Sequence, residues 1–393
     1  MVVEIAKEVV PSIAIIGGGP SGLGLAALLE AYGVKDYVVY ERSDRETKPR
    51  GACLDLHPGS GQKVFKEVGA FDELREVGRW GEETIHYICN TKLDRLFEFG
   101  EGRDAPEVDR YDMRRILLGV IPDEKVRWRC GVESSKRDEN GQIVLKLTNG
   151  RSVSGFKLII GADGAYSQIR HLVTPAKLRY TGHTIFTTQV SPGNPHYKRT
   201  EETFTRSNMA ICGNSNLIWS APQGAGIFRW DLCIPVPEDF ERDLSNAEDN
   251  KKFFLQDKYF GSFDPEIQEV IKHSEGDWRP WKLYIMPSDC FNWKSQADVT
   301  LIGDAAHATT PWVGDGVNCA MRDSLVLAKL LQEHGISKQT VEAYEQQMFV
   351  WAEDLIRRSN FSGEMFLDEQ NPTRLVEFMK TSMHTLLGHT DNV

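Results

Sequence analysis

The stretch IAIIGGGPSGLGLAALLEAYGVKDYVVYE, residues Ile13–Glu41, decides the fold of this chain. The apolar run Ile13–Ile16 predicts a short strand, the small residues from about Ser21 to Tyr32 predict a helix, and Tyr37–Tyr40 predicts a second strand. Two short strands joined by one helix form a compact βαβ unit. The sequence therefore predicts an α/β fold that begins at the start of the chain.

Gly17, Gly19 and Gly22 fill the pattern G-x-G-x-x-G between the first strand and the helix. The first glycine permits a tight turn, the second lets a pyrophosphate approach the backbone, and the third brings the helix against the strand. Glu41 ends the second strand, at the position where a carboxylate accepts hydrogen bonds from a ribose. The unit therefore predicts a site for an adenine dinucleotide, and by itself it does not say which one.

Composition and charge limit the classes of function. The chain has 57 acidic and 46 basic residues and a formal net charge of −11, so it lacks the basic footprint of a nucleic-acid-binding protein. Its 393 residues exceed the roughly 250 to 300 at which a single core stops growing, which favours two domains. The seven cysteines include no C-x-x-C pair, which argues against a disulfide framework and a zinc site. We expect a small-molecule partner and no metal.

The start of the chain bears on localisation. The segment MVVEIAKEVVPS contains Glu4, Lys7 and Glu8, so it lacks the apolar core of a signal peptide. No run approaches the roughly 18 apolar residues of a membrane span. We expect a soluble, cytoplasmic protein without a membrane span, either a monomer or a homodimer.

The rest of the chain predicts a second sheet and further helices. Residues 1–176 should form the first part of the dinucleotide-binding domain, with a hairpin near residues 84–99 that joins the second domain. Residues 177–285 contain aromatic and β-branched strands broken by Pro and Gly clusters, which predicts an antiparallel-sheet domain. Residues 286–393 should complete the first domain and end in helices, the last of them near Lys338–Ser359.

Asn-Gly turns at Asn140 and Asn149 predict a meander that includes strands near residues 143–147 and 158–160. No second glycine-turn βαβ unit follows, so a nicotinamide cofactor would have no domain of its own.

Two later segments repeat the design of a buried strand that ends in a glycine turn. One is LIIGADGAYSQIR, Leu158–Arg170, and the other contains LIGDAAHATTPWVGDGVN, Leu301–Asn318. Gly314 and Gly316 leave bare backbone at the start of a helix, where free N–H groups stabilise negative charge. The Gly314–Gly316 segment therefore predicts a site for negative charge, whereas Asp163 could belong to a plain Asp-Gly turn at a strand end.

The three segments together resemble the signature set of the FAD-dependent aromatic-hydroxylase family, single-component flavoprotein monooxygenases similar to para-hydroxybenzoate hydroxylase. Two further stretches, LDLHPGSGQ at Leu54–Gln62 and EVDRYDMRRILL at Glu107–Leu118, most resemble the tetracycline-modifying subgroup of that family. The resemblance implies a Rossmann-like FAD-binding domain, an antiparallel β-sheet substrate domain and a helical C-terminal part.

The resemblance also implies functional residues. Glu41 would hold the adenosine ribose, Asp304 the ribityl or pyrophosphate region, and Arg114 would reach the flavin side of the cofactor. The implied FAD-binding set is Gly17, Gly19, Gly22, Glu41, Arg42, Ala52, Asp55, Arg114, Asp163, Asp304, Gly316, Val317 and Asn318. Lys48 and Arg50 could meet the phosphates of a visiting nicotinamide dinucleotide.

Several of these residues could instead have a purely structural role. Arg114 could be a surface arginine, Asp163 and Arg170 could hold the strand end, and His307 could pack against its loop. Asp315 departs from the subgroup, which tends to carry a neutral residue there, and its carboxylate could oppose an anionic flavin or cap the helix.

The substrate side is less determined. Candidate substrate residues are Gln189, Trp219, Phe228, Arg229 and Trp230, although such aromatic residues more often pack a core. The catalytic acid or base is unassigned, with Gln189, Arg229 and Pro311 as candidates.

The implied reaction is monooxygenation of a small aromatic or polycyclic compound. NADPH or NADH would reduce FAD, and O2 would then form a C4a-hydroperoxyflavin that delivers one oxygen atom. The outcome could be hydroxylation, epoxidation or a Baeyer-Villiger reaction. The alternatives are an FAD-dependent dehydrogenase or reductase, or a non-catalytic dinucleotide-binding protein.

Overall fold

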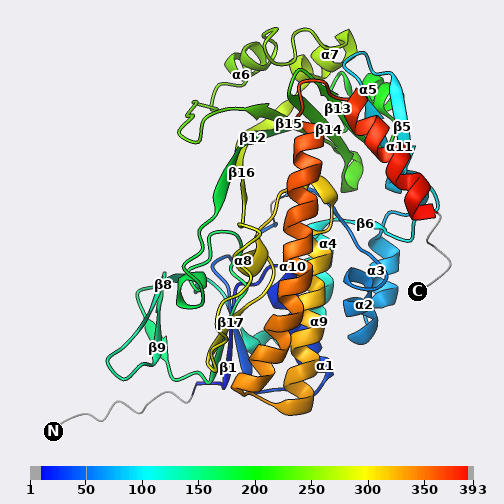
Figure 1. The fold of residues 1–393 in the computed structure, drawn as a ribbon. Helices are drawn as coiled ribbons and strands as arrows, with labels where there is room; N and C mark the ends of the chain where they lie inside the picture. The colour runs from blue at the N-terminus through cyan, green and yellow to red at the C-terminus, as the bar shows by residue number, and fades with distance from the viewer. Residues whose placement is uncertain (1–9, 50, 388–393) are drawn as a thin grey trace.

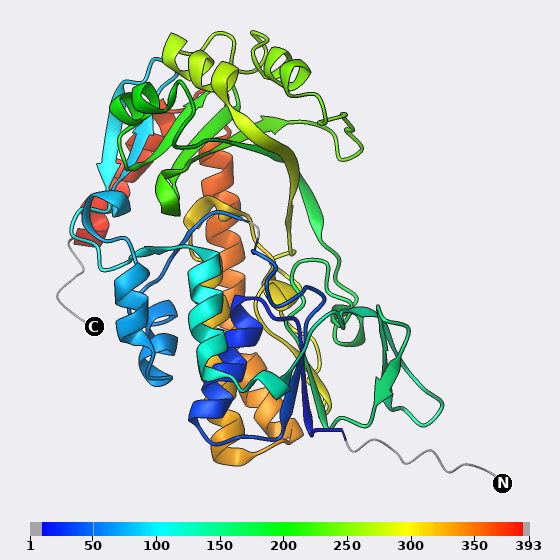
Figure 2. The same ribbon diagram turned by 180° about the vertical axis from the view of Figure 1, so that it is seen from behind.

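The computed structural model describes residues 10–49 and 51–387 (Figure 1 and Figure 2). Arg50 lies outside the described residues. Residues 1–9, on which the prediction that the chain has no signal peptide mainly depends, also lie outside them. Within the described part of the chain, no helix has the length and the apolar content needed to cross a membrane.

The first layer is a five-stranded parallel sheet in the order β17-β11-β1-β2-β7. Its strands are β1 (Ile13–Ile16), β2 (Tyr37–Tyr40), β7 (Val126–Arg127), β11 (Leu158–Gly161) and β17 (Val299–Leu301). Four of them are buried at every position, as expected of strands covered on both faces. The predicted βαβ unit forms the middle of this sheet.

Helices cover one side of the parallel sheet, and a small antiparallel meander lies on the other side (Figure 1). The helices are α1 (Pro20–Ala31), α4 (Arg110–Val120), α9 (Gly316–His334) and α10 (Lys338–Phe366), and the meander consists of β8 (Val132–Arg137), β9 (Ile143–Leu147) and β10 (Ser152–Ser154). The prediction that the strand near residues 158–160 belongs to this meander was wrong. That strand is β11, which is apolar on both faces and pairs in parallel with β1 and β17.

The second layer is a seven-stranded sheet in the order β16-β12-β15-β14-β13-β4-β5. Its strands are β4 (His86–Cys89), β5 (Arg95–Phe99), β12 (Arg179–Val190), β13 (Asn208–Gly213), β14 (Asn216–Pro222), β15 (Phe228–Pro235) and β16 (Glu275–Ile285). All neighbouring strands are antiparallel except β4 and β13, which pair in parallel. The β4–β5 hairpin thus extends a sheet whose other strands come from later in the chain.

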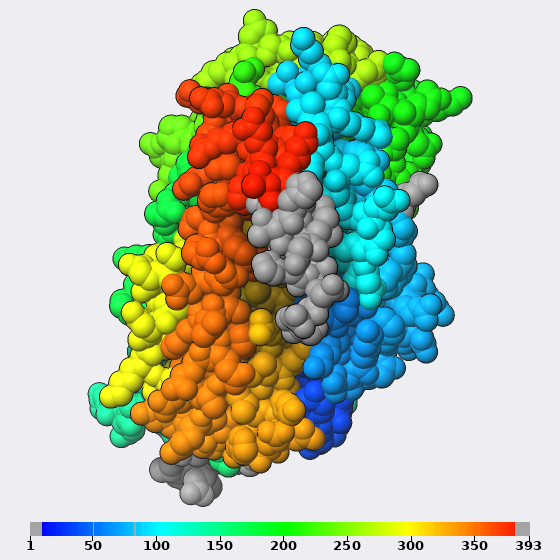
Figure 3. All heavy atoms as spheres, turned by 45° about the vertical axis from the view of Figure 1, so that its right-hand side comes forward, coloured from blue at the N-terminus to red at the C-terminus, as the bar shows by residue number. Residues whose placement is uncertain are grey.

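Different elements cover the two faces of this sheet. The far face packs against α5 (Tyr197–Phe204), α6 (Ala247–Phe254) and α7 (Pro265–His273) around an aromatic core. The near face meets Trp312, Met365 and Phe366, and then α11 (Thr373–Leu387). Figure 3 shows α11 in red against the cyan β4–β5 region. The near face is therefore the one turned toward the elements that follow β17.

Short elements connect the two layers. The ribbon of β3 (Leu54–Asp55) and β6 (Glu107–Val108) lies between them. Along the chain α2 (Gly61–Glu67) and α3 (Phe71–Val77) come between β3 and β6, and α8 (Asp304–His307) follows β17. Five 3-10 turns complete the described elements: η1 (Gly81–Thr84), η2 (Asp123–Lys125), η3 (Arg170–Leu172), η4 (Gly224–Gly226) and η5 (Pro311–Val313).

A buried carboxylate joins β17, α9 and α10. Asp323 is fully buried and accepts hydrogen bonds from the backbone N–H of Gly303 at 2.7 Å and from Trp351 Nε1 at 2.9 Å. Its Oδ2 lies 2.7 Å from His307 Nε2, and its charge raises the pKa of His307 although burial alone would lower it. His307 is therefore packed within the core and hydrogen-bonded to Asp323.

We expect Asp323→Asn to lower the free energy of unfolding by about 3–5 kcal/mol, because it removes one partner of the buried Asp323–His307 pair and one of the acceptors of Gly303 and Trp351. Urea denaturation at neutral pH measures this change. The control is Asp298→Asn, which removes an exposed ion pair with Arg137 and should cost less than about 1 kcal/mol. Equal losses in the two variants would contradict the assignment.

Candidate functional site

The three glycines of the first turn differ in their surroundings. Gly17 has φ +112°, and a Cβ atom there would lie 2.3 Å from the carbonyl oxygen of Ala162. A Cβ at Gly22 would lie 2.0 Å from the carbonyl oxygen of Gly17, whereas a Cβ at Gly19 would meet nothing within 4 Å. The first and third glycines are therefore required by close backbone packing, and the second presents bare backbone to open space at the start of α1.

Glu41 lies beside this turn. Its side chain is buried and accepts hydrogen bonds from the backbone N–H of Gly18 at 2.6 Å and of Ser43 at 2.7 Å. Each carboxylate oxygen retains a second lone pair for a further donor. Arg42, the next residue, is exposed.

Arg170 joins the segment Leu158–Arg170 to the segment Leu301–Asn318. Its guanidinium is buried and donates to the carbonyls of Ala165 at 2.7 Å, Asp304 at 2.8 Å and Ala305 at 2.7 Å. Arg170 thus fastens the loop after β11 to α8. Asp163, in the same loop, accepts from the N–H of Gln168 at 2.7 Å, and its other oxygen is buried without a hydrogen-bond partner.

Asp304 lies in a recess, because its side chain is accessible and yet largely surrounded by protein. Burial raises the pKa of this carboxyl group, while His307, Arg110 and Arg170 act in the opposite direction. The recess lies next to the first motif, since a Cβ at Gly303 would approach Ser21 Oγ to 2.7 Å. We call the space bounded by Asp304, Arg110 and Ala52 the Asp304 recess.

Arg110 was not among the predicted site residues, although it lines this recess. It is the first residue of α4 and donates from Nε to the carbonyl of Ala52 at 3.0 Å. Burial lowers its pKa; the negative charge of Asp304 opposes this effect, and the positive charge of Arg229 adds to it. The charge of Arg110 therefore interacts both with Asp304, in the segment Leu301–Asn318, and with Arg229 of β15.

Arg114, one helical turn further, does not make these contacts. Its guanidinium donates to the carbonyls of Asp44 and Thr47 and lies over the ring of Trp128. It fastens the loop that follows Glu41, so Arg110 and not Arg114 has its side chain beside Ala52 and Asp304. The sequence signal was present, because residues i and i+4 share one helix face, but it could not say which arginine points inward.

The start of α9 is fastened to the loop after β3. Asn318 is buried, donates to the carbonyl of Asp55 at 3.0 Å, and accepts from the N–H of His57 at 2.8 Å. Gly316 and Val317, ahead of it, are half-buried. Asp55 forms an ion pair with Arg103 at 2.8 Å, and His57 and Arg103 together hold the pKa of Asp55 below its usual value despite burial.

The predicted substrate residues fall on opposite faces of the sheet. Gln189 pairs with Arg229, and Trp219 pairs with Asp231, so these side chains share the near face. Arg229 donates to Asp231 at 2.9 Å and to Thr187 Oγ1 at 3.0 Å.

An aromatic row leads from this face toward α10. The ring centroids of Trp219 and Phe366 are 6.1 Å apart, and those of Phe366 and Trp312, in the loop before α9, are 5.9 Å apart. The near face thus offers aromatic rings beside a network of charged side chains.

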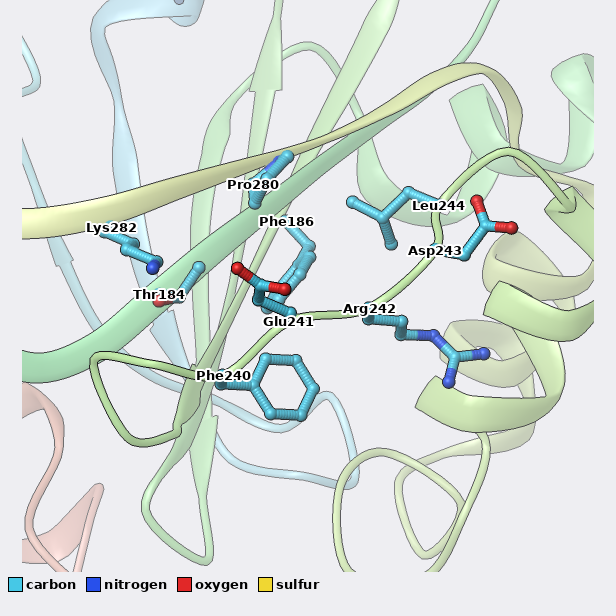
Figure 4. A pocket seen from close by; sticks show the side chains of 9 residues that line it. All are labelled: Thr184, Phe186, Phe240, Glu241, Arg242, Asp243, Leu244, Pro280 and Lys282. Carbon is cyan, nitrogen blue, oxygen red and sulfur yellow. The ribbon is translucent and has the colours of Figure 1, made fainter.

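Phe228 and Trp230 are not part of this surface. They point to the far face, where they are buried against α5 and its neighbours. A cavity of about 460 Å³ also opens on the far face, lined by Phe186, Phe240 and Lys282 among others (Figure 4). It lies across the sheet from Arg229 and is separate from the Asp304 recess.

Two other predicted residues lie at the surface. Lys48 and Pro311 are exposed, and Arg50 is outside the described residues. Asp315 does not cap α9 through its side chain but pairs with Arg358 at 2.7 Å.

Glu107, in β6, is a second residue that the sequence did not single out. It is buried opposite Asp55 in the β3–β6 pair and lies 3.3 Å from Asn208 Nδ2. Burial, followed by the charge of Asp55, raises the pKa of Glu107 to about 7. A carboxyl group with a pKa of about 7 therefore lies in the β3–β6 ribbon, between the five-stranded and the seven-stranded sheet.

Comparison with known proteins identifies the family. A family model described as an FAD binding domain matches residues 11–203 and 265–359. The chain belongs to the FAD-dependent aromatic-hydroxylase family of monooxygenases. The predicted family, fold class and flavoenzyme class are confirmed, as is FAD as the cofactor.

Individual relatives are distant. Monooxygenase asqM of Emericella nidulans is 28% identical over 372 residues, which cover 81% of this chain and 83% of that protein. A variant of HpxO from Klebsiella pneumoniae, solved with FAD, has a TM-score of 0.77 at 21% identity and covers 95% of this chain and 94% of its own. The tetracycline destructase Tet(51) has a TM-score of 0.70 at 19% identity and covers 98% and 99%. The two structures show a shared fold.

We expect Gly19→Ala and Gly22→Ala to separate cofactor binding from folding. Gly22→Ala should lower the free energy of unfolding by about 2 kcal/mol or more, because the added methyl group meets the backbone of Gly17. Gly19→Ala should leave the apoprotein melting temperature unchanged and weaken FAD binding at least ~10-fold, equivalent to ~1.4 kcal/mol. Thermal unfolding of apoprotein and FAD titration measure the two effects. A Gly19→Ala protein that binds FAD like the parent would place the pyrophosphate elsewhere.

We expect Glu107 to make stability fall as pH rises from about 4.5 to about 7. In this range folded Glu107 retains a proton that the unfolded chain has released, so its contribution is full at low pH and is lost through the folded pKa. The free energy of unfolding of Glu107→Gln, relative to that of the parent, should rise by on the order of 3 kcal/mol between pH 5 and pH 8. Urea denaturation at both pH values measures the gain, and Glu133→Gln, an exposed partner of Lys146, should show none.

Proposed function

We propose that the protein is an NAD(P)H-consuming monooxygenase that inserts one oxygen atom of O2 into a small aromatic or polycyclic compound. The observation that carries this proposal is the position of Arg110, which begins α4, donates to the Ala52 carbonyl at 3.0 Å and lies within reach of the charges of Asp304 in a cofactor motif and Arg229 on the near face. A cofactor held at Asp304 would therefore end next to the surface that carries Trp219.

The residues fit a long dinucleotide. Gly17, Gly19 and Gly22 would hold its pyrophosphate and Glu41 its ribose, because the turn is open at Gly19 and the carboxylate is fixed beside it. Asp304, with Arg110 and the backbone at Ala52, would hold the ribityl region, and the start of α9 at Gly316 and Val317 would meet the flavin end. When bound and reduced by NADPH or NADH, FAD supplies the oxygenating chemistry through a C4a-hydroperoxyflavin.

The chain itself supplies orientation and exclusion of water. The half-buried ring of Trp219 could stack on a flat substrate, with the buried rings of Phe366 and Trp312 packed behind it, and Arg229 offers a charged donor that Asp231 and Thr187 hold in place. Gln189 lies at the end of the same face and donates to Ser191 Oγ at 2.9 Å. An aromatic or polycyclic compound would therefore stack on Trp219 better than an aliphatic one.

The test is a screen of phenolic and polycyclic compounds for stimulated oxidation of NADPH and NADH, followed by product mass under ¹⁸O₂. One labelled oxygen atom in the product supports the proposal. Oxidised product without added oxygen would favour a dehydrogenase or reductase, and stimulated peroxide release without product would identify an effector. A protein that takes up FAD but never oxidises a nicotinamide dinucleotide would favour a non-catalytic role.

We expect Trp219→Ala to raise the KM of a stimulating substrate at least ~10-fold, because the substrate loses a ring face worth ~1.5 kcal/mol or more. Steady-state NAD(P)H oxidation measures the change. Phe378→Ala removes an exposed aromatic ring of α11 and serves as the control. An unchanged KM in Trp219→Ala would move the substrate away from the near face.

A further inference from the structure

The loop before α9 is supported by one segment of α10. Ser359 Oγ lies 2.7 Å from Thr310 Oγ1 and donates to the Thr310 carbonyl at 2.9 Å. Gly363 leaves room for Trp312, since a Cβ there would lie 2.7 Å from the indole ring. Arg358 adds an ion pair to Asp315 at 2.7 Å and also binds Asp354 at 2.6 Å. The segment 358–363 therefore holds the loop at Thr310, Trp312 and Asp315.

Asp315 occupies a position at which an aspartate side chain usually caps the helix. It is the N-cap residue of α9, but its side chain accepts no capping hydrogen bond. A negative charge there offsets the positive potential of the 19-residue helix, which would otherwise favour an anion. The groups that face it are Arg358 from α10, His57 with Nδ1 3.6 Å from Asp315 Oδ1, and Cys319 one turn further along α9.

We propose that Arg358 is a positioning residue for the flavin, which neutralises Asp315 and so restores the positive potential at the start of α9. This inference rests on the placement of the flavin end at Gly316 in the proposed function. Reduced flavin carries a negative charge that the oxidised form lacks. The Asp315–Arg358 pair therefore sets how much more tightly the protein binds the reduced form than the oxidised form.

The charges predict opposite effects for the two partners. Arg358→Gln leaves Asp315 uncompensated and should weaken the preference for reduced over oxidised FAD about tenfold, which lowers the two-electron midpoint potential by ~30 mV. Asp315→Asn removes the negative charge, so the positive charge of Arg358 and the positive potential of the helix start are unopposed. This variant should raise the midpoint potential. The double variant should return close to the parent value, and Arg358→Lys, which keeps the charge, should stay near it.

The experiment is reduction of each FAD-bound variant against reference dyes, with FAD affinity and thermal unfolding measured alongside. Arg357→Gln is the matched control, because Arg357 is the neighbouring exposed arginine and pairs with Asp354. Shifts of opposite sign in the two single variants that cancel in the double variant support the inference. Shifts of the same sign, or none beyond that of Arg357→Gln, overturn it.

The result is independent of oxygenation. Potentials that follow the predicted cycle in a protein that never oxygenates a compound would overturn the proposed function alone. Normal oxygenation with unchanged potentials would overturn only the role of Arg358.

Discussion

No side chain fits between Gly17 and the carbonyl oxygen of Ala162, so the ends of β1 and β11 meet through bare backbone. This contact places the loop with Asp163 directly beside the glycine turn. Arg170 then fastens that loop to α8 through the carbonyls of Asp304 and Ala305. Segments more than a hundred residues apart thus converge at the carboxyl edge of one parallel sheet, where an α/β fold binds its dinucleotide.

Much of the fold could be predicted from the sequence because local signals and burial agree. The apolar runs of β1, β2 and β17 are buried strands, and α7 occupies Pro265–His273, as Pro265 after the capping Asp264 indicates. The end of α10 could not be predicted. The predicted helix ends near Ser359, whereas α10 continues to Phe366, and Gly363 lies inside it because Trp312 occupies the space of a side chain. Only tertiary packing carries that information.

The site was harder to predict than the fold, for a similar reason. Phe228, Arg229 and Trp230 are consecutive, and alternation along a strand puts only the middle one on the near face. The sequence cannot select that face, because helices cover both sides of the sheet and both sets of side chains are partly or fully buried. Likewise, Arg110 and Arg114 share a helix face, and only the neighbouring loops decide which one enters the Asp304 recess.

One helix relates the two layers to each other. Near its start, α10 is bound to β17, since Tyr344 donates to the Leu301 carbonyl at 2.9 Å and Glu345 accepts from Thr300 at 2.7 Å. At its end, Phe366 packs on the near face beside Trp219. A continuous α-helix of 29 residues is about 43 Å long and resists bending. The loop that α10 holds near its end, at residues 358–363, can therefore shift little against either layer, which keeps the cofactor turn and the aromatic surface at a fixed separation.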